Sequence, residues 1–422
     1  MVPKTLQEIK GLGEFPSDWA IQSADDLTSK ITKGTTPPKS EITDDPIIPF
    51  LRVNNLSFNG DLNDSSDMIY VSKDAHTKFL ARSIAYPGDI LMNIVGPPLG
   101  KVSMLNQDFD EYNMNQAIVV YRTESDKVDN NYFLHYLLSL PAQNWLQSRS
   151  KKTSGQQNLT IEICKSLPVP IPPLSEQQKI AKILSTWDKA ISTTECLIDN
   201  STQQKKAVMQ QLLTGKKRLL DESGKRFEGD WEQSTLGSIC KFSQGFQVGV
   251  DEQTPEQKDG LVRFIRIVDY TKESEPARYI APKSNYYKVD KQDVVMVRYG
   301  EAGLTCRGYE GVIANNLFLI SPDKGKLSKA YLFKFLRYNF KNISVLAASS
   351  TMPALKFTDL KMFKIEVPLL PEQQKIATVL TNADKEIELL EQQLADLQQE
   401  KKALMQQLLT GKKRVVVDGE LK

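Results

Sequence analysis

Few side chains in this sequence are placed where they could carry out catalysis or hold a metal ion. The chain has two histidines, His76 and His135, and neither recurs at the matching place of the internal repeat described below. Its four cysteines form no closely spaced pair, although zinc knuckles and disulfide frameworks both depend on such spacing. The sequence therefore predicts no catalytic residue and no metal site, and it favours a reducing compartment.

Two glycine-rich stretches resemble nucleotide-binding loops but fail on spacing. Residues 96–101 read GPPLGK, one residue shorter than a phosphate-binding loop, and Val102 stands where the magnesium-binding Ser or Thr belongs. Residues 11–16 read GLGEFP, with proline in place of the last glycine of a dinucleotide motif. The acidic residues Asp323 and Asp359 match a nuclease cluster no better than chance. We expect no cofactor in this chain itself.

Polar side chains suited to reading DNA remain, and most of them lie in predicted loops. Arg and Lys pair with guanine edges, Asn and Gln with adenine edges, and Ser and Thr with phosphate. For any single residue a solvated loop side chain is the simpler interpretation, but the set occupies similar places in both halves of the chain. The candidate DNA-contacting residues are Lys33, Thr35, Asn54, Asn93, Lys101, Asn115, Gln244, Arg266, Arg298, Tyr299 and Asn315.

The elements that must position these residues occur twice. Residues 176–218 begin with EQQKIA and end with MQQLLTGKKR, and residues 372–414 begin and end in the same way. The two stretches lie 196 residues apart without a gap, and 25 of their 43 positions are identical. An internal repeat of this length determines the architecture.

Each copy predicts one long helix, at about residues 175–214 and 371–410. Ser175 with Gln178 fits a capping box, Pro371 suits a first helical turn, and Gly215 and Gly411 are typical helix-ending glycines. Apolar residues at 3-4 spacing form a seam that predicts a coiled coil between the two helices. The seam residues are Leu184, Trp187, Ile191, Ile198, Val208, Leu212, Leu380, Ala383, Ile387, Leu390, Leu394, Leu397, Leu404 and Leu408.

Polar residues interrupt the seam. Lys401 does so in the second copy, and Thr194, Ser201 and Lys205 do so in the first. Two interpretations are open for the first copy. The three residues could form a surface on which a partner protein docks, or the seam could simply be imperfect.

The remainder of the chain is also duplicated, with loops that differ. FLRV at 50–53 is echoed by FIRI at 264–267, and DILM at 89–92 by DVVM at 293–296. The sequence therefore predicts a mixed α/β (α+β) fold with two similar globular domains joined by the two helices. The predicted order is a domain at 1–155, a helical region at 156–220, a second domain at 221–350 and a second helical region at 351–422. One fold with dissimilar loops is suited to two different binding surfaces.

Composition limits the partners and the location. The chain has 422 residues and a net charge of +2, so it should bind DNA only weakly without a partner, because phosphate neutralisation supplies most nonspecific affinity. We find no signal peptide and no apolar run of about 18 residues. We therefore expect a cytoplasmic protein that does not contact a membrane.

The two Glu-Gln-Gln-Lys-Ile-Ala and Leu-Leu-Thr-Gly-Lys-Lys-Arg motifs, with Trp19 and Trp231 each following an acidic residue, resemble the specificity (S) subunit of type I restriction–modification systems. The resemblance implies two target-recognition domains, an antiparallel helix pair and pseudo-twofold symmetry. It also implies that each domain reads one half of a split double-stranded DNA target. Two adenine-methylating subunits with S-adenosylmethionine, and restriction (nuclease and translocase) subunits that use ATP and Mg, would supply the chemistry.

Two other classes of function remain open. A coiled-coil adaptor could use the same domains to bind proteins instead of DNA. A related fused restriction enzyme or phage-defence system could use the chain as its DNA-reading subunit. Neither alternative requires a catalytic residue in this chain.

Overall fold

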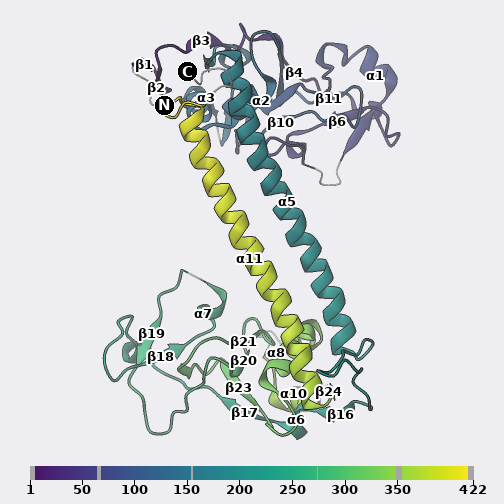
Figure 1. Cartoon of the computed structure of the whole chain (residues 1–422), viewed down its shortest axis with the longest axis vertical. Coiled ribbons are helices and arrows are strands. Elements are labelled where there is room, and N and C mark those ends of the chain that lie inside the picture. Colours follow the sequence, from purple (N-terminus) through teal and green to yellow (C-terminus); the bar gives the residue numbers. More distant parts are fainter. Residues whose placement is uncertain (1–4, 64–67, 154, 273, 348–353, 417–422) are drawn as a thin grey trace. The chain divides into compact units, whose positions relative to one another are not determined.

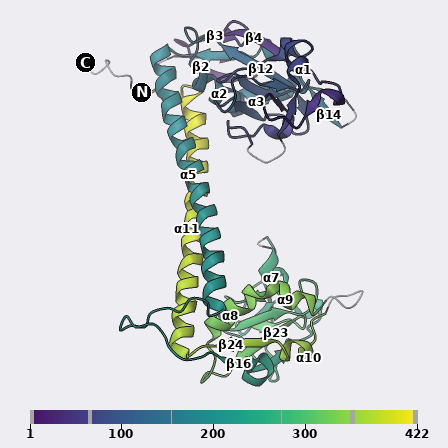
Figure 2. The ribbon, with the colours of Figure 1, turned by 90° about the vertical axis from the view of Figure 1, so that its right-hand side faces the viewer.

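The computed structural model describes residues 5–63, 68–153, 155–272, 274–347 and 354–416. It contains two globular domains and two long helices, α5 (Leu174–Leu213) and α11 (Leu370–Leu408), as Figures 1 and 2 show. The chain divides into two compact units, residues 1–195 with 392–422 and residues 196–391. Each unit therefore contains one globular domain and one half of each long helix.

The first domain is built on a four-stranded antiparallel sheet in the order β10–β8–β12–β4. These strands are Val102–Met104, Ile90–Asn93, Ile118–Thr123 and Thr28–Lys33. Alternate residues of β8 enter different cores, as the two-residue period of a strand requires. Ile90 packs with Tyr132 of helix α2 (Asn130–Leu138), whereas Leu91 packs with Leu51 of the second sheet. The sheet is therefore covered on both faces.

The second sheet of this domain has the order β11–β6–β7–β5, with strands Asn113–Met114, Pro49–Leu51, Ile69–Val71 and Ile42–Thr43. Strand β11 runs parallel to β6 and the other pairs are antiparallel. Strand β15 (Pro168–Ile171), just before α5, pairs with β3 (Ala20–Ser23), so the entry to the long helix belongs to the domain. The remaining helices are α1 (Lys73–Thr77), α3 (Leu140–Arg149) and α4 (Ile161–Lys165).

The second domain repeats this framework. Its four-stranded sheet has the order β21–β20–β23–β17, with strands Thr305–Cys306, Val294–Val297, Leu317–Pro322 and Cys240–Gln244. Its second sheet has the order β22–β18–β19, with strands Val312–Ile313, Val262–Ile265 and Arg278–Ile280, and β22 is parallel to β18. Strand β24 (Lys364–Val367) pairs with β16 (Glu232–Thr235) just before α11. Its shorter helices are α6 (Leu236–Ile239), α7 (Val268–Thr271), α8 (Lys329–Tyr338), α9 (Phe340–Val345) and α10 (Phe357–Lys361).

The strand registers confirm that the two domains share one fold. Lys33 faces Val119 in the first domain, and Gln244 faces Phe318 in the second. Two smaller features of the first domain are reduced to single antiparallel bridges among the described residues of the second. The hairpin of β1 (Leu6–Ile9) with β2 (Gly13–Pro16) corresponds to the bridge between Leu220 and Arg226. The small sheet of β13 (Lys151–Thr153), β14 (Gln156–Asn158) and β9 (Val95–Gly96) corresponds to the bridge between Tyr299 and Ala354.

The two long helices pair antiparallel within each unit. In the first unit, Asp188 of α5 binds Lys401 of α11; in the second, Lys205 of α5 binds Asp384 of α11. All fourteen predicted seam residues are buried or half-buried. Leu184 shares a core with Leu408, a contact that ties the start of α5 to the end of α11.

The predicted helices at about 175–214 and 371–410 differ from the observed ones by one or two residues at each end, since α5 spans Leu174–Leu213 and α11 spans Leu370–Leu408. Gly215 and Gly411 have φ of +68° and +67°, the left-handed conformation of a helix-ending glycine. Pro371 lies in the first turn of α11. The predicted cap at Ser175 is wrong: α5 begins at Leu174, and the Glu176 amide donates 2.8 Å to the Pro173 carbonyl.

No helix among the described residues is long and apolar enough to cross a membrane. The same part of the chain contains no group of three or more His, Cys, Asp or Glu side chains that could hold a metal ion.

Candidate nucleic-acid interface

The four-stranded sheet of each domain gathers most of the predicted contact residues at one edge. Strand β4 ends at Lys33 and β8 ends at Asn93, while β12 begins three residues after Asn115. Because neighbouring strands are antiparallel, these three chain positions meet at the same edge. The corresponding edge of the second domain collects Gln244, Arg298 and Asn315.

Asn93 lies inside the first domain, away from any surface that DNA could reach. Its side chain is fully buried; its amide nitrogen donates 2.8 Å to the Pro98 carbonyl, and its oxygen accepts 2.9 Å from the Lys101 amide. Asn93 therefore fixes the loop of residues 94–101, and the sequence-based assignment of Asn93 as a base contact does not fit this geometry.

The other candidate residues of the first domain differ in how far their side chains are free to contact DNA. Lys33 and Asn54 are exposed. Thr35 accepts 3.1 Å from Arg82 Nε, and Asn115 accepts 3.1 Å from the amide of Ala117. Lys101 is half-buried, and its ammonium group donates 3.1 Å to the Val53 carbonyl.

In the second domain, three candidates form one network. Arg298 Nη1 donates 2.9 Å to Gln244 Oε1, and the Gln244 amide nitrogen donates to the Asn315 carbonyl. The Arg298 guanidinium also stands 5.0 Å from the ring centre of Tyr299. This network leaves Asn315 exposed at the surface.

Arg266 has a structural role. Its Nε donates 3.1 Å to Asp269 Oδ2, and its Nη2 donates 2.8 Å to the Pro276 carbonyl. The guanidinium is thus used to hold helix α7 and the segment that follows it, and Arg266 is a weaker candidate for DNA contact than its residue type indicates.

The strand ladder corrects one pairing of the two halves. Sequence similarity aligns Asn115 with Asn315, an offset of 200. In the structure, the Asn115 amide donates to the Leu51 carbonyl and the Ala314 amide to the Ile265 carbonyl, an offset of 199. Asn315 therefore occupies the place of Gln116, one residue away from the place that sequence similarity indicates.

Two glycines at this edge were missed by sequence analysis. A Cβ on Gly34 would lie 2.1 Å from the Met114 carbonyl oxygen, and one on Gly245 would lie 2.1 Å from the Ala314 carbonyl oxygen. Backbone therefore crosses backbone at this point in both domains. The sequence feature that could have identified them is the glycine that follows both Lys33 and Gln244. It is the one residue that the two otherwise dissimilar loops share at the same position.

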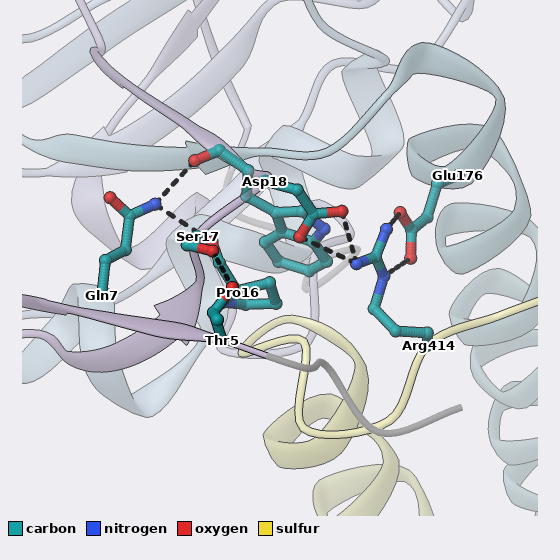
Figure 3. Close-up of polar contacts among 8 residues, drawn as sticks. Thr5, Gln7, Pro16, Ser17, Asp18, Glu176 and Arg414 are labelled. Carbon is teal, nitrogen blue, oxygen red and sulfur yellow. Dashed lines mark hydrogen bonds and ion pairs between the residues drawn. The ribbon is translucent and has the colours of Figure 1, made fainter.

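The repeated motifs form a second feature that we call the clasp: a buried glutamate, an arginine and a tryptophan that join a domain to the helix pair. In the first unit (Figure 3), Arg414 donates 2.7 and 2.6 Å to the two oxygens of Glu176 and also binds Asp18. Its guanidinium lies 5.6 Å from the Trp19 ring centre. The pKa of Arg414 is raised, chiefly by the hydrogen bonds to Glu176.

The second unit contains the same clasp. Arg218 donates 2.6 and 2.8 Å to Glu372, and Trp231 Nε1 donates 3.2 Å to the same carboxylate. The Glu372 side chain is 0% exposed. The glutamine after each glutamate also recurs: Gln177 accepts from the Asp129 amide and Gln373 from the Ser328 amide, at the N-caps of α2 and α8.

The polar interruptions of the seam form ion pairs inside each unit. Asp384 binds both Lys205 and Lys334, and Asp188 binds Lys401 and lies 3.6 Å from His135. Thr194 is buried, and its hydroxyl donates to the helix backbone. The hypothesis that Thr194, Ser201 and Lys205 form an open docking surface is therefore wrong for the buried Thr194, and it stays a prediction for the half-buried Ser201 and Lys205.

Two copies of one α/β domain, each held by a clasp to a helix pair and each with its own loops, define an internally duplicated scaffold with two dissimilar surfaces. The model of the type I restriction modification DNA specificity domain matches residues 16–200 and 228–399. The chain belongs to this family.

Individual relatives agree over most of the length. The MjaX specificity subunit of Methanocaldococcus jannaschii is 27% identical over 429 residues, covering 96% of both chains. The type I restriction enzyme EcoBI specificity subunit of Escherichia coli is 23% identical over 399 residues, covering 88% of this chain and 80% of the relative. The type I restriction–modification S subunit from M. genitalium has the same fold, with a TM-score of 0.60 at 17% identity over 97% of this chain and 99% of that one.

Proposed function

We propose that this chain is the non-catalytic, sequence-specific DNA-binding subunit of a type I restriction–modification complex. Each globular domain reads one half of a bipartite, asymmetric DNA target, and the helix pair sets the spacing between the halves. The observation that carries the proposal is the duplication itself: one framework, repeated with the same strand registers, presents different side chains at the same sheet edge.

The differences at that edge support two different half-sites. The first domain places Lys33 where the second places Gln244, and these are the last residues of equivalent strands. Lysine donates to guanine or phosphate, whereas Gln244 holds Arg298 and the Asn315 backbone, so the second domain presents Arg298 and Asn315 at this edge. Two domains with the same chemistry at this edge would instead favour a symmetric target.

The proposed partners are double-stranded DNA, two methyltransferase (modification) subunits and the restriction subunits. S-adenosylmethionine, ATP and Mg belong to those subunits in this proposal, and methylation and cleavage take place there. A net charge of +2 supplies little attraction for phosphate, so the partner subunits must contribute to tight binding. The complex acts in the cytoplasm, where the chromosome is.

A domain exchange tests the proposal. Residues 15–155 are replaced by the corresponding domain of another specificity subunit, and methylated adenines are mapped genome-wide in cells that also produce the methyltransferase. One half of the target should change and the other should stay the same. A change in both halves would contradict independent reading, and the absence of any bipartite methylated sequence with the unaltered chain would contradict the function itself.

A further inference from the structure

A polar groove of the second domain has not been assigned a role so far. It has a volume of about 700 Å³ and lies between helix α7 and the loop that precedes β22. Figure 1 shows α7 beside β18 in this domain. The charged and aromatic residues of the lining are three cations, two carboxylates and two tyrosines: Arg263, Lys272, Arg307, Asp269, Glu275, Tyr270 and Tyr309. This combination is typical of surfaces that bind nucleic acid.

Arg263 is held in one orientation inside the groove. Its guanidinium lies 3.9 Å from the ring centre of Tyr309, and its Nη2 donates 3.2 Å to Asp269 Oδ1. The Asp269 side chain is 1% exposed. Arg263 Nε and the Tyr270 hydroxyl are buried and have no hydrogen-bond partner among the described residues. The part of the guanidinium that can meet a planar ligand with two acceptors is therefore its pair of terminal nitrogens.

Positive charges gather beside this groove. The ring centre of Phe333 lies 4.3 Å from the guanidinium carbon of Arg307, 5.7 Å from that of Arg337 and 5.9 Å from the ammonium of Lys334. Burial lowers the pKa of Arg307 and of Lys334, and each is also lowered by a neighbouring cation. Asp384 is the carboxylate that binds Lys334, and it also binds Lys205. Mutual repulsion of these cations would be relieved by a bound anion.

The first domain lacks this chemistry at the equivalent positions. Arg307 directly follows β21, whose ladder to β20 aligns Cys306 with Ser103 of β10, so Met104 stands where the second domain has Arg307. The parallel ladders align Asn113 with Val312, which places Asp110 where the second domain has Tyr309. The N-caps of α2 and α8 likewise align Leu138 with Arg337. The cationic groove is thus a property of the second domain alone, as expected if the domains read different sequences.

We propose that, in addition to the sheet edge at Gln244, the second domain uses this groove to grip its half-site, with Arg263 donating to O6 and N7 of a guanine and with Arg307 and Arg337 binding the adjacent phosphates. The inference rests on the proposed DNA-reading function and adds the residues that perform it. Arg263 supplies two parallel N–H donors. Guanine presents two acceptors, O6 and N7, at the matching spacing in the major groove. Asp269 acts as a positioning residue because it fixes the plane of Arg263.

Methylation mapping of full-length variants together with the methyltransferase tests the base contact. Arg263→Lys keeps the charge and removes the paired donors, so we expect relaxed preference at a single guanine of one half-site, with about a tenfold or greater loss of discrimination there. The other half-site should be unchanged. Lys241→Ala, on the opposite outer strand β17, is the control and should leave the methylated sequence unaltered. If the Arg263→Lys variant keeps the sequence preference of the unaltered chain, the base contact is overturned.

Salt titration of DNA binding by the complex tests the phosphate contact. Arg337→Ala should weaken binding to all sequences alike and reduce the slope of log Kd against log salt by about one, because one phosphate contact is lost. An unchanged slope would overturn this part of the inference. These outcomes can be told apart from a failure of the proposed function. If the unaltered complex methylates no bipartite sequence, the proposed function is wrong. If it methylates a bipartite sequence and the variants behave like the unaltered chain, only the role of the groove is rejected.

Discussion

At the scale of single residues, two buried carboxylates account for the most strongly repeated motifs. Glu176 and Glu372 open the helices, and each is bound by the arginine that closes the other copy of the repeat. A buried carboxylate without a partner is costly. The sequence repeat Glu-Gln-Gln and Gly-Lys-Lys-Arg therefore encodes contacts with partners that lie 238 and 154 residues away in the chain.

Removing one partner of the clasp should destabilise its unit strongly. Arg218→Ala leaves Glu372, which is 0% exposed, with only the Trp231 donor, and we expect a loss of about 3 kcal/mol in the free energy of unfolding. Urea denaturation followed by tryptophan fluorescence measures this. Arg218→Ala with Glu372→Gln in the same chain should recover part of the loss, because no unpaired charge remains. Equal stability of the single and double variants would contradict the explanation.

His135 makes the first unit sensitive to acid. Burial and the nearby Lys401 lower the pKa of His135 to about 3. In the unfolded chain, this imidazole takes up a proton below pH of about 6.5, whereas the folded chain keeps it neutral. Stability is therefore complete above that pH and falls as the pH decreases towards 3, by up to about 1.4 kcal/mol per pH unit.

The variant His135→Gln isolates this contribution. Unfolding free energies of the two chains, measured by urea denaturation between pH 7 and 5, should converge as the pH falls, by about 2 kcal/mol over 1.5 units. Parallel curves would show that His135 is not neutral in the folded state.

At the scale of elements, the apolar periodicity and the helix-ending glycines predicted the helices well, because both signals depend on residues that are close in the sequence. Gly215 and Gly411 end the helices as expected, and the seam residues are the ones withdrawn from solvent. Residues in the sheets were harder to place. The role of Asn93 depends on the loop at 94–101. The equivalence of Asn315 with Gln116 depends on ladders to strands that are distant in the sequence. Neither contact leaves a local pattern in the sequence.

The two helix-ending glycines are equivalent in conformation but not in surroundings. A Cβ on Gly215 would meet the Trp231 ring at 3.6 Å, an ordinary contact, whereas a Cβ on Gly411 would lie 2.4 Å from Pro16 Cγ. Gly215→Ala should cost only the backbone strain, about 1 kcal/mol. Gly411→Ala should cost about 1–3 kcal/mol more, because Pro16 must move. Urea denaturation of both variants measures the difference, and equal losses would contradict it.

At the scale of the whole molecule, the duplication makes each unit a composite. A unit contains one domain, the beginning of one long helix and the end of the other. The clasp of the unit joins these two helix ends to each other. Contacts that fix helix register therefore occur in both units, with Asp188 to Lys401 in one unit matched by Asp384 to Lys205 in the other. A change in helix length must accordingly be made in both copies if both sets of contacts are to survive.

This requirement gives the spacing hypothesis a specific test. Seven residues that continue the 3-4 apolar pattern are inserted after Glu195 and after Glu391, which are equivalent positions of the repeat. Each helix gains ~10.5 Å at ~1.5 Å per residue, which corresponds to about three base pairs at ~3.4 Å each. Mapping of methylated adenines should show the same two half-sites with a spacer about three base pairs longer. The same insertion in α5 alone is the control, and it should abolish methylation because the seam and clasps can no longer form together. An unchanged spacer with the double insertion would show that the helices do not set the distance.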